Sequence, residues 1–184
     1  GGGLITVSGN TIGGRPASDS LANGADRFFR SGISMDECSG TFDGNTIQTI
    51  SHDILVRFGS SGTVQIQNNY FNGSGVQLSE QNAGVTALNV VNNFFDGTAA
   101  QVFSGTAVLR LQNNQTNIPT TVSGNAFTTH NWGISAENYK NLSITGNTFT
   151  PAAVSYRHIT INTKSLTSNS PSIVQTTISA GITG

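Results

Sequence analysis

Residues 88–95 have the sequence LNVVNNFF, and the pattern in this stretch recurs along the chain. It alternates apolar and polar residues, continues with Gly or Asn followed by Asn, and ends with Ile or Phe two residues later. Clear copies occupy residues 5–12, 64–71, 88–95 and 142–149, and weaker copies occupy residues 40–47 and 120–127. The second Asn of the pattern falls at Asn10, Asn45, Asn69, Asn93, Asn125 and Asn147. A pattern that returns every 22 to 35 residues indicates repeated structural units.

A second column of short apolar segments lies between these copies. The segments begin at Ile33, Ile54, Val76, Val102, Ile134 and Val154. Both columns lengthen between residues 93 and 134, which indicates one shared insertion of about ten residues. The run VLRLQNN at residues 108–114 could itself be a copy of the pattern, and the extra residues could either precede or follow it.

The alternation of apolar and polar residues has a period of two, which predicts short strands with one buried face. Gly, Asn and Ser between the strands favour turns, because Gly and Asn tolerate left-handed backbone conformations. One turn of such a chain cannot bury its own apolar face, whereas turns stacked about 4.8 Å apart pair their backbones and enclose a core. We therefore expect a ladder of hydrogen-bonded amides at Asn45, Asn69, Asn93, Asn125 and Asn147. We expect a stack of buried rings at Phe71, Phe95, Phe127 and Phe149.

The repeated NN-x-F and GN-x-F segments resemble the right-handed parallel β-helix repeat of the pectate-lyase-like superfamily, over roughly residues 4–161. The resemblance implies an all-β fold, a right-handed parallel β-helix of about six to eight turns with roughly 22 residues each. An antiparallel β-sandwich also suits short strands, but it does not require an Asn at the same offset in every unit. The superfamily includes polysaccharide lyases, glycoside hydrolases, epimerases, phage tailspikes and adhesins, so the fold does not identify the function.

The composition excludes several classes of partner. Only 9% of the residues are charged and the net charge is −1, so nothing electrostatic favours nucleic acid. No apolar run of about 18 residues is present, so we expect no membrane span. Cys38 is the only cysteine and no phosphate-binding or zinc-binding motif occurs, so we expect no disulfide, no metal and no cofactor. Low charge with many Ser, Thr and Asn residues favours an extracellular or cell-surface location.

We expect residues 1–184 to form a single β-helix domain with one inserted loop at residues 13–31. The loop makes the first turn about twelve residues too long, and it could be a surface cap or a binding loop. Both ends of the sequence resemble interrupted repeats. We therefore expect either a segment of a longer chain or a solenoid that stacks on other copies of itself, end to end or side by side.

The candidate catalytic residues are Asp36, Asp53 and Arg57. Glycosidases need two carboxyl groups about 5 to 10 Å apart around the sugar, and these two acids lie on neighbouring turns of the expected helix. A lyase that resembles the superfamily would use a basic side chain, which Arg57 could supply. Solvated faces and ion pairs between turns are the alternative interpretation of all three residues.

The candidate substrate-binding residues are His130, Trp132, Arg27 and Arg30. The first two place an imidazole beside the only indole, which can stack on a sugar ring, and the two arginines lie in the inserted loop. Packing within a turn is the alternative for the indole.

Counting along the second column also predicts two ion pairs. Asp36 and Arg57 lie three residues after their segment starts, and so do Glu137 and Arg157. Stacked positions are about 4.8 Å apart, so we expect both pairs to meet on the outer surface.

These observations favour a non-catalytic extracellular β-helix segment of a surface fibre, an adhesin or a phage tail protein. Polysaccharide or cell-surface glycan is the partner that such a segment would bind. The alternative is a polysaccharide lyase or glycoside hydrolase of the pectate-lyase-like type, which would need an acid pair and a basic residue on one solvent face.

Overall fold

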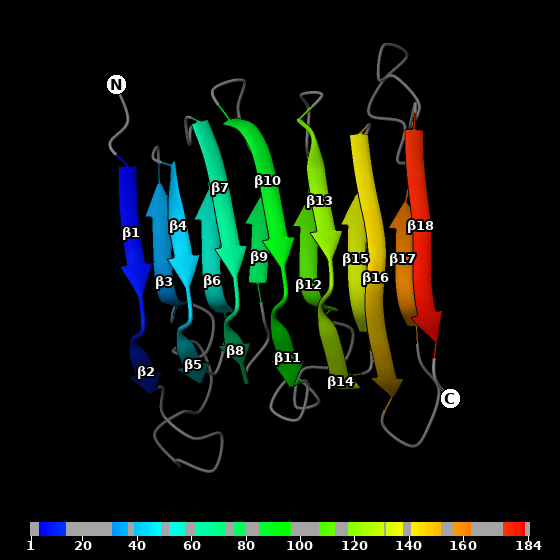
Figure 1. The fold of residues 1–184 in the computed structure, drawn as a ribbon, viewed down its shortest axis with the longest axis horizontal. Coiled ribbons are helices and arrows are strands. Elements are labelled where there is room, and N and C mark those ends of the chain that lie inside the picture. Colours follow the sequence, from blue (N-terminus) through cyan, green and yellow to red (C-terminus); the bar gives the residue numbers. More distant parts are fainter. Residues whose placement is uncertain are drawn as a thin grey trace, which may run out of the picture.

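In a computed structural model the chain is all-β, and strand after strand returns to the same two sheets (Figure 1). The structure describes residues 4–13, 31–36, 39–48, 52–57, 62–72, 76–79, 85–96, 107–112, 118–130, 132–137, 141–151, 157–162 and 175–182. Every pairing between described strands is parallel, so the expected all-β, parallel arrangement is confirmed and the antiparallel sandwich is excluded.

Sheet A, the larger sheet, has two rows of strands. The upper row contains β1 (Leu4–Ser8), β4 (Ser39–Asp43), β7 (Gly62–Gln67), β10 (Val85–Val91), β13 (Thr120–Ser123), β16 (Asn141–Pro151) and β18 (Gln175–Ile182). The lower row contains β2 (Thr11–Gly13), β5 (Thr46–Gln48), β8 (Tyr70–Phe71), β11 (Phe94–Asp96) and β14 (Ala126–His130). The long strand β16 pairs with strands of both rows and so joins them into one curled sheet.

Sheet B lies behind the upper row of sheet A in Figure 1, and its strands run in the opposite direction. It contains β3 (Ser31–Asp36), β6 (His52–Arg57), β9 (Val76–Ser79), β12 (Ala107–Gln112), β15 (Trp132–Glu137) and β17 (Arg157–Asn162). Each pass of the chain therefore adds one strand to each row of sheet A and one to sheet B, which is compatible with a parallel β-helix.

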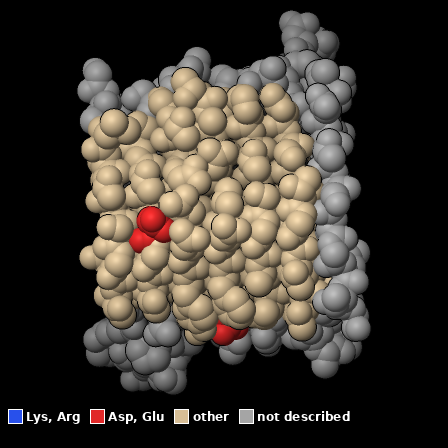
Figure 2. All heavy atoms as spheres, viewed as in Figure 1, with Lys and Arg blue, Asp and Glu red and all other residues tan. Residues whose placement is uncertain are grey.

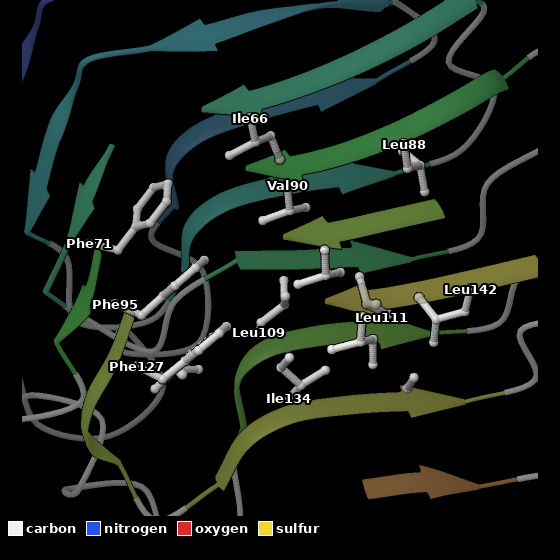
Figure 3. Packing of buried hydrophobic residues seen from close by; sticks show 14 of the residues in the cluster. Ile66, Phe71, Leu88, Val90, Phe95, Leu109, Leu111, Phe127, Ile134 and Leu142 are labelled. Atoms are coloured by element: carbon white, nitrogen blue, oxygen red, sulfur yellow. The ribbon is translucent and has the colours of Figure 1, made fainter. Parts of the chain in front are cut away.

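The core fills the space between the sheets, as Figure 3 shows. Ile66, Leu88 and Val90 from sheet A are 0% exposed, and so are Leu109 and Leu111 from sheet B. Their polar sequence neighbours face outward, as a period of two requires. The one-sided burial of these short strands is therefore a direct consequence of their sequence alternation.

Four rings stack at the lower end of this core. The centroid distances are 5.1 Å for Phe71 and Phe95, 4.7 Å for Phe95 and Phe127, and 4.9 Å for Phe127 and Phe149. All four side chains are at most 1% exposed. The inward direction and the stacking expected from the sequence are both observed.

The corner between the two rows of sheet A explains why the pattern needs Gly or Asn before the ladder Asn. This position has a positive φ in all six described copies, between 55° and 65°, at Gly9, Gly44, Asn68, Asn92, Gly124 and Gly146. Gly adopts this left-handed conformation without steric cost, and Asn tolerates it better than other side chains do.

The prediction of a second column of apolar segments is correct in part. The structure pairs Ile33 with Ile54, Ile54 with Val76 and, further along, Ile134 with Ile159. Leu109 occupies the register between Val76 and Ile134. The starts at Val102 and Val154 are therefore wrong, because Leu109 and Ile159 hold those places; Val102 and Val154 lie outside the described residues.

This register also places the shared insertion. The run that begins at Val108 belongs to β12 of sheet B, so it is not a copy of the Asn pattern. Residues 97–106 separate β11 from β12, whereas only residues 72–75 separate β8 from β9. Most of the extra residues therefore precede β12. The first insertion also falls on a connection from the lower row of sheet A to sheet B, between Gly13 of β2 and Ser31 of β3. Its residues 14–30 are outside the described part.

Candidate functional site

The ladder at the corner of sheet A is the most extensive polar feature of the described residues. The Asn93 amide shows its geometry: its Oδ1 accepts from the Asn69 backbone N at 3.0 Å and from Asn69 Nδ2 at 2.9 Å. Its Nδ2 donates to Asn125 Oδ1 at 3.0 Å and to the Ile66 carbonyl at 2.9 Å. The same pattern links Asn10, Asn45, Asn69, Asn93, Asn125 and Asn147. The predicted ladder is confirmed, and it is a structural device.

Sheet B brings two of the three catalytic candidates together. Asp36 on β3 is the register partner of Arg57 on β6, as the count along the second column predicted. Their side chains lie outside what the structure describes, so the ion pair stays a prediction. Asp53 lies four residues before Arg57 on the same strand, about 13 Å away along its axis. Because Asp36 is level with Arg57, the backbones of the two acids, Asp36 and Asp53, are separated by more than the 5 to 10 Å of a glycosidase acid pair.

The second predicted ion pair is wrong. Glu137 pairs in register with Asn162, and Arg157 pairs with Trp132 at the opposite end of β15. The error follows from the start at Val154, because the true start at Ile159 moves the third position by five residues. The backbones of Glu137 and Arg157 therefore do not lie side by side in register.

The substrate-binding candidates do not share a described surface. Trp132 begins β15 two residues before the buried Ile134, and it is half-buried with contacts of its own. His130 ends β14 and pairs in register with Pro151, and its side chain is not among those described. Arg27 and Arg30 lie outside the described residues.

An aromatic pair on the outer face of the lower row was missed by the sequence reasoning. Tyr70 on β8 and Phe94 on β11 are register partners, with ring centroids 5.4 Å apart and an interplanar angle of 10°. Phe94 is 40% exposed, whereas the next residue, Phe95, is 1% exposed. Both outward rings occupy the position of the repeat that accepts any residue. Two aromatic residues at that position in successive copies were the available signal.

The hydroxyl group of one ring in this pair is hydrogen-bonded to a carboxylate. The Tyr70 hydroxyl donates to Asp96 Oδ2 at 3.0 Å. Burial, together with the hydrogen bond and the negative charge of Asp96, raises the pKa of Tyr70 above the ordinary value for a phenol. The hydroxyl therefore remains protonated, and a donor, throughout the neutral range.

The outer face of the upper row is polar and carries little charge. Its first row of side chains is Thr6, Thr41, Gln65, Asn89, Thr121 and Ser143, and its second row is Ser8, Asp43, Gln67, Val91, Ser123 and Thr145. Among the described residues visible in Figure 2, acidic atoms appear in two places and no Lys or Arg appears. Hydrogen bonds from Asn68 and Gln67 hold the pKa of the Asp43 carboxyl below its ordinary value.

The described residues contain no group of three or more His, Cys, Asp or Glu side chains that could hold a metal ion. No helix in the described part is long and apolar enough to cross a membrane. Comparisons with protein-family models, with curated proteins and with solved structures found no match.

Proposed function

We propose that this chain is a right-handed parallel β-helix of the pectate-lyase-like type that serves as a non-catalytic segment of an extracellular surface fibre, an adhesin or a phage tail protein. The observation that carries the proposal is the unbroken ladder from Asn10 to Asn147, which runs beside the phenylalanine stack. Five ladder steps at the spacing of adjacent strands extend about 24 Å. A rod of this kind is held together along its length by backbone pairing, buried amides and stacked rings.

The surface chemistry supports the same function. The upper row of sheet A presents hydroxyl and amide groups, which hydrogen-bond to sugars without selecting for charge. Only 9% of the residues are charged, which suits a surface that meets glycans rather than nucleic acid. Glycan is the partner that we propose for the segment.

One observation favours the alternative, a polysaccharide lyase or glycoside hydrolase. Asp36 and Arg57 lie side by side in register on sheet B, so an acid and a base could act on one bound sugar. An inter-strand ion pair explains the same placement without catalysis.

The two functions differ in turnover. Incubation with neutral and acidic polysaccharides should release no new reducing ends and no ultraviolet-absorbing unsaturated ends. Turnover that is abolished in Asp36→Ala and Arg57→Ala, but retained in Asp43→Ala on the outer face of sheet A, would establish the enzyme and overturn the fibre function.

A further inference from the structure

The first pass of the chain, β1 to β3, forms one end of the stack (Figure 1). Each of these strands pairs with a single described neighbour, which is β4, β5 or β6. At the other end of the upper row, β18 points in the same direction as β1 and pairs, among the described strands, with β16 alone. The unpaired N–H and C=O groups of an edge strand are a template for another strand. The described upper row therefore has a free edge at each end.

The core is open at the β1 end. Of the three large apolar side chains that are exposed in the described part, two lie on β1: Leu4 is 88% exposed and Ile5 is 40% exposed. The residues that follow Ile5 in the same register, Val64 and Leu88, are 0% exposed. Leu142, in the last pass before β18, is 2% exposed. A strand laid against β1 would therefore bury apolar surface that every later pass buries.

The amide ladder is also incomplete at the β1 end. Asn10 donates from its backbone N and from Nδ2 to Asn45 Oδ1, both at 3.0 Å. Every later Asn of the ladder accepts two such hydrogen bonds from the pass before it, but no described residue donates to Asn10 Oδ1. The Asn10 side chain is exposed, whereas Asn45 is 1% exposed. This end therefore offers a hydrogen-bond acceptor to the backbone N–H or side-chain amide of one more strand.

The register of the stack shows that β18 matches this edge. Carried from strand to strand along sheet A, it makes Ile178 of β18 equivalent to Val7 of β1 and makes Ala180 equivalent to Asn10. If β1 of a second copy continues the sheet beyond β18, Ile178 becomes the register partner of Val7. The backbone N–H of Ala180 then takes the place of the ladder N–H that would donate to Asn10 Oδ1.

We propose that the β1 edge is a docking surface for β18 of a second copy of the chain, so that copies associate head to tail with a continuous sheet A. Sheet A carries the contact, because the described residues after β17 add a strand to that sheet and none to sheet B. A contact between two different ends leaves one end of each kind free, so it repeats and builds a filament or a ring. The inference goes beyond the proposed function, since neither glycan binding nor the absence of turnover enters it.

Sedimentation velocity over a range of protein concentrations tests the association. We expect the weight-average mass to rise with concentration. Ile5→Lys should raise the concentration at half association about tenfold or more, because the contact would bury an unpaired charge. Thr41→Lys, on the outward face of β4, adds the same charge away from the edge and should leave the association unchanged. Circular dichroism should show that both variants remain folded.

Disulfide trapping tests the direction of the contact, in protein that carries Cys38→Ser. Register partners on adjacent strands are about 4.8 Å apart, within the range that a disulfide spans. Thr177 has the register of Thr6, so an oxidised mixture of Thr6→Cys protein and Thr177→Cys protein should form the mixed dimer. Thr121→Cys replaces Thr177→Cys in the control mixture, because Thr121 lies in the same row on an interior strand. That mixture should cross-link at least about tenfold more slowly.

Three results would overturn the inference. The first is a monomer at every concentration. The second is faster cross-linking of Thr6→Cys protein with itself than with Thr177→Cys protein, which would indicate that two β1 edges meet head to head. The third is equal cross-linking in the Thr121→Cys control, which would indicate random collision. Each of these results would leave the proposed glycan-binding function in place.

Discussion

At the scale of single residues, the ladder shows why an amide is needed at a buried corner. Asn93 is 2% exposed, and its Oδ1 and Nδ2 serve neighbouring passes of the chain on both sides. Only a side chain that both accepts and donates can do this, so neither Asp nor Leu replaces it. Burial without these partners would cost more than the net gain of an ordinary hydrogen bond.

Asn93→Ala should lower the free energy of unfolding by about 1 to 3 kcal/mol, because it leaves the Asn69 backbone N–H and the Ile66 carbonyl without partners. Urea unfolding followed by circular dichroism measures the change. Asn89→Ala is the matched control, since Asn89 faces outward and its Nδ2 donates a hydrogen bond to Gln65 Oε1. An equal loss of unfolding free energy in both variants would mean that a buried ladder amide contributes no more stability than an outward-facing one.

Two adjacent phenylalanines test whether the side chains of β11 alternate between solvent and core. Phe95→Ala should cost about 3 to 5 kcal/mol, since it removes a ring packed between Phe71 and Phe127. Phe94→Ala should cost about 1 kcal/mol or less, because that ring is exposed and, among the described residues, stacks on Tyr70 alone. The same denaturation experiment measures both. Similar costs at the two positions would show that β11 does not alternate as described.

At the scale of elements, the corner before each ladder Asn is defined by backbone conformation. Asn92 has a φ of 55°, as does Asn68, where other passes of the chain use Gly. The side chain is exposed, so the backbone conformation and not packing restricts this position.

Asn92→Gly should therefore be nearly neutral, whereas Asn92→Val should destabilise the protein by about 1 to 2 kcal/mol. A β-branched residue is strained at positive φ, and strain at this corner disturbs the ladder Asn that follows. Thermal unfolding of the two variants provides the comparison. A valine variant as stable as the glycine variant would show that the corner can adopt another conformation.

The strands of the two sheets differed in how well the sequence predicted them. In sheet A each alternating segment is followed directly by the corner Asn, so the sequence itself shows which residues of successive strands are register partners. In sheet B no such residue follows the apolar segments, and spacing alone favoured Val102 and Val154. The structure instead pairs Leu109 with Ile134 and Ile134 with Ile159. Connections of variable length made spacing an unreliable guide there.

At the scale of the whole molecule, each pass of the chain contacts the passes before and after it. The ladder steps are 24 residues from Asn45 to Asn69 and 24 residues from Asn69 to Asn93. Stability in such an array is approximately a sum of units and their interfaces. Removal of one complete unit should therefore preserve every remaining register.

Deletion of residues 69–92 should leave a folded protein, because it removes one complete unit and places Asn93 next to Asn45 in the ladder. The two flanking passes can then pair directly. Deletion of the half unit 69–80 should prevent folding, because it sets strands of sheet A against the register of sheet B. Far-ultraviolet circular dichroism and the cooperativity of thermal unfolding distinguish the results. If both deletions unfold the chain, the passes are not interchangeable units.

The outward aromatic pair shows the limit of sequence reasoning at this scale. The outward direction of Tyr70 and Phe94 follows from local alternation, but Ala126, which flanks Phe94 on the other side, is 32 residues beyond it and is brought beside it by the register of β11 and β14. By contrast, counting along the sequence correctly predicted that Asp36 and Arg57 lie on adjacent strands, and their backbones are register partners.

The sequence by itself determined which side chains face the core and where the chain turns, because period-two alternation and the left-handed corner are properties of neighbouring residues. It also determined the Asn ladder and the Phe stack, whose members share one offset from that corner. Only the tertiary structure decided that Leu109 and Ile159 take the places in sheet B that spacing assigned to Val102 and Val154, where the insertion lies, and which residues flank Phe94. Those pairings depend on how successive passes stack across connections of unequal length, and the physical constraint that sets them is the continuous backbone hydrogen bonding of the parallel sheets.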